Sequence, residues 1–135
     1  MNPTIGKITG INGNMITVAV QGNIMQNEVA FIVKDEQRLK CEVVRIGDGT
    51  AYLQVFESTK GILVGDTVEF SGELLAVQLG PGLLGQVYDG LQNPLPELAE
   101  HHGFFLPRGI VLPALEGDSK WEFDPTAKVG DTVIK

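Results

Sequence analysis

Gly80-Pro81-Gly82-Leu83-Leu84-Gly85-Gln86-Val87-Tyr88-Asp89-Gly90-Leu91-Gln92-Asn93-Pro94-Leu95 divides this chain of 135 residues into two unlike parts. The residues before this stretch alternate between apolar and polar side chains and are separated by turn signals, which is typical of short β-strands. The residues after it show no such regular spacing of strands. The stretch therefore predicts a connector between two differently built regions.

The glycines of this stretch have the G-x-G-x-x-G spacing of dinucleotide-binding proteins, at positions 80, 82 and 85. Such a site requires a helix that opens at the third glycine, because the N-terminus of that helix holds the pyrophosphate. Gly90, Pro94 and Pro96 follow instead, and in a helix each glycine costs about 1 kcal/mol and each proline about 3 kcal/mol. We therefore interpret the stretch as a glycine-rich crossing and not as a dinucleotide site.

The same residues carry a family resemblance. The runs at residues 79–85, 88–92 and 94–95 resemble the signature that joins the N-terminal barrel to the rest of the catalytic A subunit of V-type and A-type rotary ATP synthases. Further similar pieces are Arg108-Gly109, Val111, Pro113-Ala114-Leu115, Lys120-Trp121, Phe123 and Pro125-Thr126, with a less specific one at residues 6–11. The resemblance covers the whole chain, and the family protein is several times longer.

Composition excludes several classes of protein. The net charge is −7, which argues against nucleic acid as a partner and against direct docking on an anionic membrane. No apolar run approaches the ~18 residues that span a bilayer. The N-terminus lacks the pattern of a signal peptide, so we expect a cytoplasmic chain. The single cysteine, Cys41, excludes an internal disulfide, and its alternation with Leu39 and Val43 predicts a buried apolar role and not a reactive thiol.

Residues 4–75 predict six closely spaced strands, at residues 5–10, 15–20, 28–33, 39–46, 51–56 and 67–70. Turn signals at Asn12-Gly13-Asn14 and Asp48-Gly49 separate some of them, and the polar run at residues 34–38 is expected to be a loop. The alternation slips at Val43-Val44, which indicates a bulge or burial on both faces. Such spacing suggests a small barrel or sandwich, and closure is favoured because it removes exposed strand edges.

After residue 74 we expect a seventh extended run at residues 74–79, the glycine-rich crossing, and one short helix at residues 96–102. Pro96 suits the first turn of that helix, Gly103 its end, and Phe104 and Phe105 are expected to anchor it by packing. Trp121 and Phe123 then alternate in an extended piece. Val129-Gly130-Asp131-Thr132-Val133 repeats Val64-Gly65-Asp66-Thr67-Val68, which we interpret as reused turn chemistry. Lipoyl and biotinyl carrier domains share this pentapeptide, but the carrier-lysine turns Met-Lys-Met and Asp-Lys-Ala do not occur.

The sequence predicts a mainly β fold. We expect a small closed N-terminal β-barrel at residues 1–75, a Gly/Pro-rich connector with the short helix at residues 76–109, and the start of a second, inserted β domain at residues 110–135.

No catalytic, cofactor-binding or metal-ligating residue is predicted within the chain. His101 and His102 are adjacent on a helix and point in different directions, so they do not face one ion. The acidic pair Asp35-Glu36 lies in a polar loop. Nucleotide hydrolysis by a rotary ATPase needs the P-loop G-x-x-x-x-G-K-[ST], and the sequence contains neither Gly-Lys-Ser nor Gly-Lys-Thr.

The resemblance implies the N-terminal part of a catalytic subunit that binds Mg-ATP and couples ATP synthesis or hydrolysis to proton or sodium transport. It also implies partners, namely alternating related B-type subunits and stalk subunits, and a peripheral place on a membrane-bound complex. In that setting the barrel would serve assembly of the hexameric ring. The alternative is a free-standing β-barrel protein-binding module without nucleotide chemistry. A reading frame with a P-loop downstream of Lys135 would favour the first interpretation, and a natural stop codon there the second.

Overall fold

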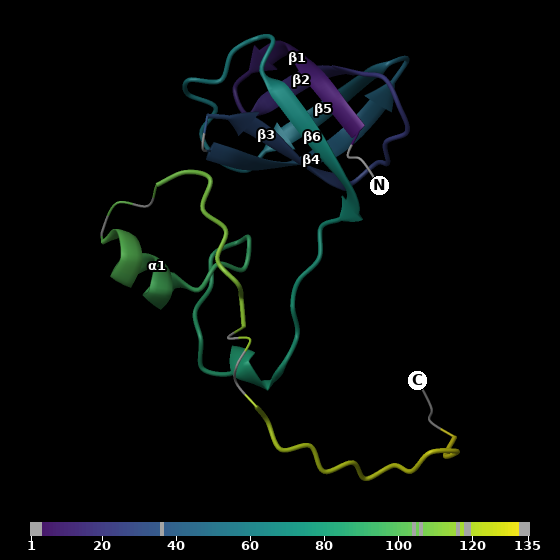
Figure 1. The fold of residues 1–135 in the computed structure, drawn as a ribbon, viewed down its shortest axis with the longest axis vertical. Coiled ribbons are helices and arrows are strands. Elements are labelled where there is room, and N and C mark those ends of the chain that lie inside the picture. Colours follow the sequence, from purple (N-terminus) through teal and green to yellow (C-terminus); the bar gives the residue numbers. More distant parts are fainter. Residues whose placement is uncertain are drawn as a thin grey trace.

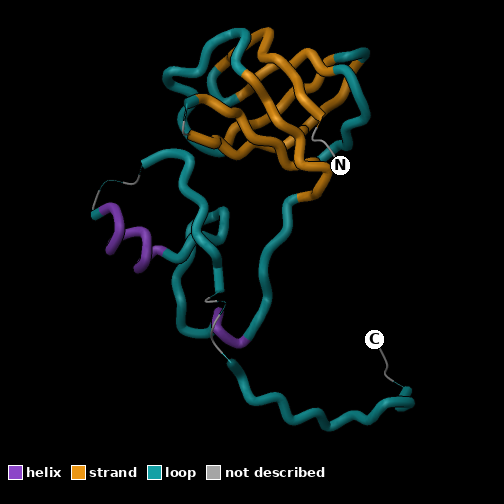
Figure 2. The backbone as a smooth tube through the Cα atoms, in the orientation of Figure 1, coloured by secondary structure: helices purple, strands orange, loops and turns teal. Residues whose placement is uncertain are grey.

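The computed structural model describes residues 4–35, 37–103, 105, 107–115, 117 and 120–132. Within these residues the chain forms strands β1 (Thr4–Asn12), β2 (Met15–Val20), β3 (Glu28–Lys34), β4 (Gln37–Gly47), β5 (Thr50–Val55) and β6 (Thr67–Leu74). A 3-10 helix, η1 (Pro81–Leu83), and one α-helix, α1 (Leu95–His102), follow. The strands gather at one end of the molecule, and the later residues extend away from them (Figures 1 and 2).

The strands form a closed antiparallel barrel in the order β1-β2-β5-β4-β3-β6. Closure comes from β6, which pairs with β1 on one side and with β3 on the other. Phe70 of β6 lies opposite Thr4 in the first pair and opposite Ala30 in the second. The predicted mainly β fold with a small closed barrel is confirmed, and the sandwich is not formed.

Tight turns set the register of the hairpins. Asn12 pairs with Met15, so only Gly13 and Asn14 turn the chain, and Gly13 supplies a φ of 59°. The predicted bulge is confirmed, because the β4–β5 register shifts between Val43 and Arg45.

The polar run at residues 34–38 is a shorter loop than predicted. Lys34 pairs with Gln37 across the β3–β4 hairpin, which brings both residues and Arg38 into strands. Arg38 is held there by Glu69 on β6, at 2.8 Å between Nη1 and Oε2, and by the Phe31 ring, 4.8 Å from its guanidinium carbon. The pairing therefore extends the hairpin through a polar sequence that local patterns assign to a loop.

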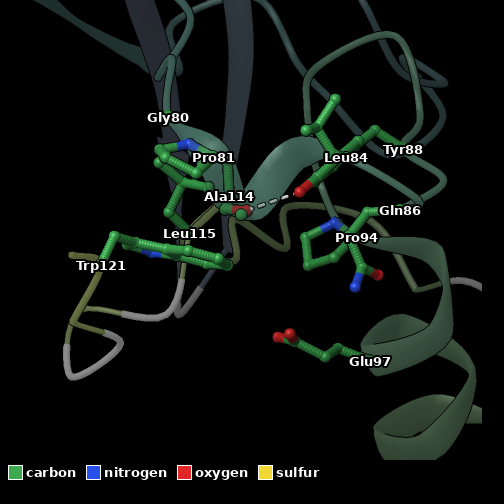
Figure 3. A pocket seen from close by; sticks show the side chains of 11 residues that line it. Gly80, Pro81, Leu84, Gln86, Tyr88, Pro94, Glu97, Ala114, Leu115 and Trp121 are labelled. Carbon is green, nitrogen blue, oxygen red and sulfur yellow. Dashed lines mark hydrogen bonds between the residues drawn. The ribbon is translucent and has the colours of Figure 1, made fainter. Parts of the chain in front are cut away.

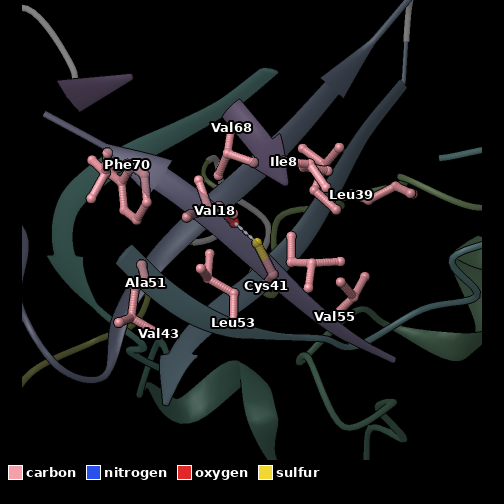
Figure 4. Packing of buried hydrophobic residues seen from close by; sticks show 14 of the residues in the cluster. Ile8, Val18, Leu39, Cys41, Val43, Ala51, Leu53, Val55, Val68 and Phe70 are labelled. Carbon is pink, nitrogen blue, oxygen red and sulfur yellow. Dashed lines mark hydrogen bonds between the residues drawn. The ribbon is translucent and has the colours of Figure 1, made fainter. Parts of the chain in front are cut away.

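Alternate strand residues fill the barrel interior with aliphatic side chains and one aromatic ring (Figure 4). The largest fully buried apolar side chains are Phe70, Ile8, Ile16, Ile32, Leu53, Val18, Val43, Val55 and Val68. Cys41 is also fully buried, as predicted, and its Sγ donates to the carbonyl of Ala30 at 3.2 Å. Burial raises the pKa of the Cys41 thiol to about 12, so the thiol stays protonated and unreactive at neutral pH.

Glu28 is a buried carboxylate at the start of β3, with 2% of its surface exposed. Its Oε2 accepts a hydrogen bond from the Met25 amide at 2.7 Å, and its Oε1 accepts one from the Gly72 amide at 2.6 Å. Beside it, the Ser71 hydroxyl donates to the Val29 carbonyl at 2.6 Å. Glu28 thus ties the loop after β2 to the end of β6, close to the point where the chain leaves the barrel.

The helix forms close to the predicted residues. It starts at Leu95, carries Pro96 in its first turn, and buries Leu98. Gly103 ends it with a φ of 68°, and its amide donates to Ala99 at 2.8 Å. Phe105 is 89% exposed, so its predicted anchoring role is wrong, while Phe104 lies outside the described residues.

Two expectations concern residues on either side of the helix. β6 runs to Leu74, and residues 75–79 leave the barrel as an exposed segment outside any strand. Among the described residues from 105 to 132 the structure contains no strand. The second β domain expected at residues 110–135 therefore stays a prediction.

Replacing Glu28 by alanine should lower the free energy of unfolding by about 1–3 kcal/mol, because two backbone N–H groups in a partly buried setting lose their acceptor. Urea unfolding followed by circular dichroism measures the change. Glu28→Gln, which keeps one amide oxygen, should cost less. Glu73→Ala removes an exposed carboxylate and serves as the control; equal effects of the Glu28 and Glu73 substitutions would contradict the assigned role.

Candidate functional site

The glycine-rich crossing forms a compact turn and not a nucleotide-binding helix start. Gly80 has an extended backbone, and residues 81–83 make a single 3-10 turn that the Leu84 amide closes on the Pro81 carbonyl at 3.2 Å. Gly85 has a φ of 80°, and the first α-helix begins only at Leu95. The geometry on which a G-x-G-x-x-G site depends is therefore not built at the third glycine.

Two of these glycines make room for a side chain from later in the sequence. A Cβ at Gly80 would lie 3.0 Å from Cδ1 of Leu115, and one at Gly82 would lie 3.2 Å from Cδ2 of the same residue. Leu115 therefore packs directly on the crossing. Any larger residue at these positions would push it away.

Hydrogen bonds among Asp89, Leu91 and Asn93, here called the clasp, hold the rest of the crossing together. The Asp89 carboxylate accepts hydrogen bonds from the Leu91 amide at 2.9 Å, and from the backbone and side-chain amides of Asn93 at 2.8 Å each. Asn93 is buried, and its Oδ1 accepts from the Leu112 amide at 2.9 Å. Tyr88 donates from its hydroxyl to the Ala114 carbonyl at 2.9 Å (Figure 3). Residues 88–93 thereby fix the path of residues 112–114.

The pKa of the Asp89 carboxyl is lowered, although its burial on its own acts in the raising direction. The hydrogen bonds from the Asn93 side chain, the Asn93 amide and the Leu91 amide outweigh burial, and the positive charge of Lys40 on β4 adds to them.

A cavity of about 450 Å³ lies between the crossing, α1 and the residues Ala114, Leu115 and Trp121 (Figure 3). Its wall combines backbone polar groups with the apolar side chains of Pro81, Leu84, Leu115 and Trp121, while Glu97 brings one carboxylate from α1. Trp121 is 57% exposed. Among the described residues that line it, no acids, bases or nucleophiles converge as they do in a reaction centre.

The segment after α1 returns to the barrel. Arg108 donates from Nη1 to the carbonyls of Ser58 and Lys60, at 2.8 and 2.5 Å, in the loop between β5 and β6. The Gly109 amide donates to both carboxylate oxygens of Glu57, at 3.0 and 3.1 Å. In the sequence, Arg108-Gly109 attracts attention only through the family resemblance. Glu57 was not singled out, because no local pattern marks this residue of a polar loop as a bonding partner.

The Gly-Asp dipeptide of both pentapeptide copies lies in the same kind of turn. Asp66 donates its amide to the Leu63 carbonyl at 3.1 Å and accepts the Leu63 amide on Oδ2 at 2.8 Å. Asp131 makes the same pair of bonds with Lys128, at 3.1 and 2.8 Å. Gly65 and Gly130, which precede the two aspartates, have φ values of 96° and 100°. The interpretation as reused turn chemistry is confirmed.

His101 and His102 lie exposed at the end of α1, with ring centroids 6.3 Å apart and planes tilted by 56°. Across the described ranges, no group of three or more His, Cys, Asp or Glu side chains comes together in a way that could hold a metal ion. Nor does that part of the chain contain a helix with the length and hydropathy needed to cross a membrane.

Comparison with known proteins identifies a family whose members resemble this chain. Residues 8–72 match the ATP synthase alpha/beta family, beta-barrel domain. The chain is 62% identical over 133 residues, 98% of its length, to the V-type ATP synthase alpha chain of Treponema denticola. It is 58% identical over 131 residues, 97% of its length, to that of Borrelia garinii subsp. bavariensis, and 57% identical over 129 residues, 96% of its length, to that of Borrelia duttonii. It spans 23, 23 and 22% of the lengths of these three relatives.

The Asp89 clasp should weaken in acid. A carboxyl whose folded-state pKa is depressed contributes stability above its unfolded-state pKa, and that contribution is lost as the pH falls through the folded-state pKa. Carboxyl carbon chemical shifts followed against pH should therefore show a titration midpoint for Asp89 below the ordinary value of 3.8. Asn93→Ala removes one donor and should move the midpoint upward. A wild-type midpoint at or above 3.8 would contradict the clasp.

Proposed function

The chain belongs to the ATP synthase alpha/beta family through the β-barrel domain at residues 8–72, and we propose that it supplies the barrel and connector of a V-type ATP synthase alpha chain. The observation that carries the proposal is the identity of 62% over 98% of the chain, because this match continues beyond the barrel through the connector. The closed antiparallel barrel agrees with the fold that the family description states.

The whole alpha chain, in this proposal, is the catalytic subunit of a rotary machine that couples ATP synthesis or hydrolysis to proton or sodium transport. Mg-ATP would bind to a part of the alpha chain other than the barrel and connector. The support is chemical: the sequence has no G-x-x-x-x-G-K-[ST] run whose backbone amides, lysine and hydroxyl could hold the phosphates and Mg²⁺.

The barrel itself would serve assembly. Three alpha chains would alternate with three related B-type subunits, and their barrels would form a crown on the ring, with stalk subunits as further partners. The surface of this barrel offers apolar side chains for such contacts, including Ile5 on β1 at 54% exposure and, in the loop between β5 and β6, Leu63 at 61% and Val64 at 65%. A specific junction of this kind needs to bury only about 1,200–2,000 Å² in total. The assembled complex would place the chain on the cytoplasmic side of a membrane as a peripheral component.

The connector would set how the crown sits on the nucleotide-binding body. Its clasp at Asp89 and Asn93 fixes the backbone, while apolar side chains such as Leu79 and Leu84 stay 80% and 85% exposed. A surface of this kind can be covered by a neighbouring domain without any change in the path of the connector.

The chain alone should not bind Mg-ATP, because a P-loop is missing from its sequence. Isothermal titration calorimetry should show no binding heat, whereas an intact alpha chain under the same conditions should bind. A dissociation constant tighter than roughly 10 μM, about −7 kcal/mol, would contradict the proposal that Mg-ATP binds outside the barrel and connector.

Deletion of residues 1–75 from an intact alpha chain should weaken formation of the hexameric ring, because each junction in the crown loses a contact surface. Native mass spectrometry of the reconstituted ring measures assembly as a function of concentration. Calorimetry on the isolated deletion variant serves as the control, since its affinity for nucleotide should change little. Intact hexamers with an unchanged dependence on concentration would refute the assembly role of the barrel.

A further inference from the structure

The barrel is joined to the connector at two places in the described chain. The covalent path runs through residues 75–79, which lie in no strand or helix and include Val77 at 62% and Leu79 at 80% exposure. The second place is the return of the chain at Arg108 and Gly109 to the loop between β5 and β6. Two attachments hold a body at a defined angle, whereas an exposed covalent segment alone leaves it free to turn.

The second attachment is built from four hydrogen bonds across about fifty residues of sequence. Arg108 bridges two carbonyls of the loop, those of Ser58 and Lys60, and Glu57 receives the Gly109 amide on both of its oxygens. Charged groups take part in all four bonds, and such bonds are stronger than bonds between neutral groups. We refer to Glu57, Arg108 and Gly109 together as the latch.

Gly109 is the residue that allows the latch to close. Its φ is +74°, a region that other L-residues rarely adopt. A Cβ at this position would also lie 3.2 Å from both the backbone nitrogen and the carbonyl oxygen of Arg38 on β4. Because these are backbone atoms inside a barrel strand, they do not move aside easily, and a side chain at residue 109 would hold the two parts apart.

The contact around the latch is polar and incompletely packed. A cavity of about 620 Å³ lies beside it, lined by Lys34, Leu39, Lys60, Ile62 and Arg108 among others. A contact made of a few charged hydrogen bonds beside an open cavity opens at a much lower free-energy cost than an apolar core, so the joint is suited to switching between two arrangements.

We propose that the latch is a conformational lock that fixes the angle between barrel and connector, and that its opening lets the barrel turn as a rigid body about residues 75–79. In the closed state, α1 and the barrel tumble as one unit. In the open state, the strands keep their pairing and core, while α1 and the clasp at residues 88–93 change orientation relative to the barrel. The inference concerns the chain's own contacts and does not depend on the proposed function.

Residual dipolar couplings measured by NMR on the chain test this lock directly. In the wild type, the amide couplings of α1 and of the strands should fit one common alignment tensor. Gly109→Ala should abolish the common fit by reducing the couplings of α1, while the strand couplings stay as they were. Gly117→Ala is the matched control, because nothing lies within 4 Å of a Cβ placed there.

Amide exchange adds a second measurement from the other side of the latch. Glu57→Ala should speed exchange of the Gly109 amide roughly tenfold to hundredfold, the range expected for loss of a hydrogen bond to a charged acceptor. Glu57→Gln keeps an acceptor and should show a smaller change, and exchange in β1–β6 should be unaffected in both.

Three results would overturn the proposal. The first is independent tumbling of α1 and the barrel in the wild type. The second is a common alignment tensor that survives in Gly109→Ala. The third is loss of the strand signals in both Gly109→Ala and Glu57→Ala, because it would make these residues part of the barrel's own stability and not a joint.

Discussion

The pairing of β6 with both β1 and β3 is the constraint on which the rest of this structure depends. Without β6, two long strands would expose unpaired amides and carbonyls along their edges, and Val68 and Phe70 would leave the core. Closure brings Thr67 opposite Lys7, far earlier in the chain. It also fixes the place where Leu74 leaves the barrel, and Glu28 holds that exit by its bond to the Gly72 amide. The last strand of the barrel therefore sets the point at which the connector begins.

The loop between β5 and β6 serves the barrel and the connector at once. Ile62 from this loop is buried with the core residues, and Lys34 on β3 holds the loop through the Gly61 carbonyl and the Asp66 carboxylate. The carbonyls of Ser58 and Lys60 accept from Arg108. Since the core and β3 immobilise the loop, Arg108 meets preorganised acceptors, and the ordering cost of this contact is low.

Local sequence signals predicted the strands, the hairpin turns and the start of α1, because a glycine with positive φ or a proline in a first turn acts over a few residues. The bulge at Val43-Val44 was also predictable, because the alternation of apolar and polar residues slips within a few positions there. The latch and the bond between Asn93 and the Leu112 amide were not predictable in this way, because Glu57 bonds to a residue 52 positions later and Asn93 to one 19 positions later. Phe105 shows the converse: its apolar side chain suggests packing, but no local pattern says that a partner surface is present, and the side chain is 89% exposed.

The barrel and the connector are stabilised by different physical means. The barrel depends on its apolar core, whereas Asp89 and Glu57 hold the connector by accepting backbone N–H groups on ionised oxygens. Charged hydrogen bonds to the backbone fix a path without covering apolar surface, which leaves Leu79, Leu84 and Trp121 exposed. A connector built like this keeps its shape before a partner arrives and still presents the apolar area that a partner covers. These properties agree with the proposed place of this chain in a multi-subunit ATP synthase.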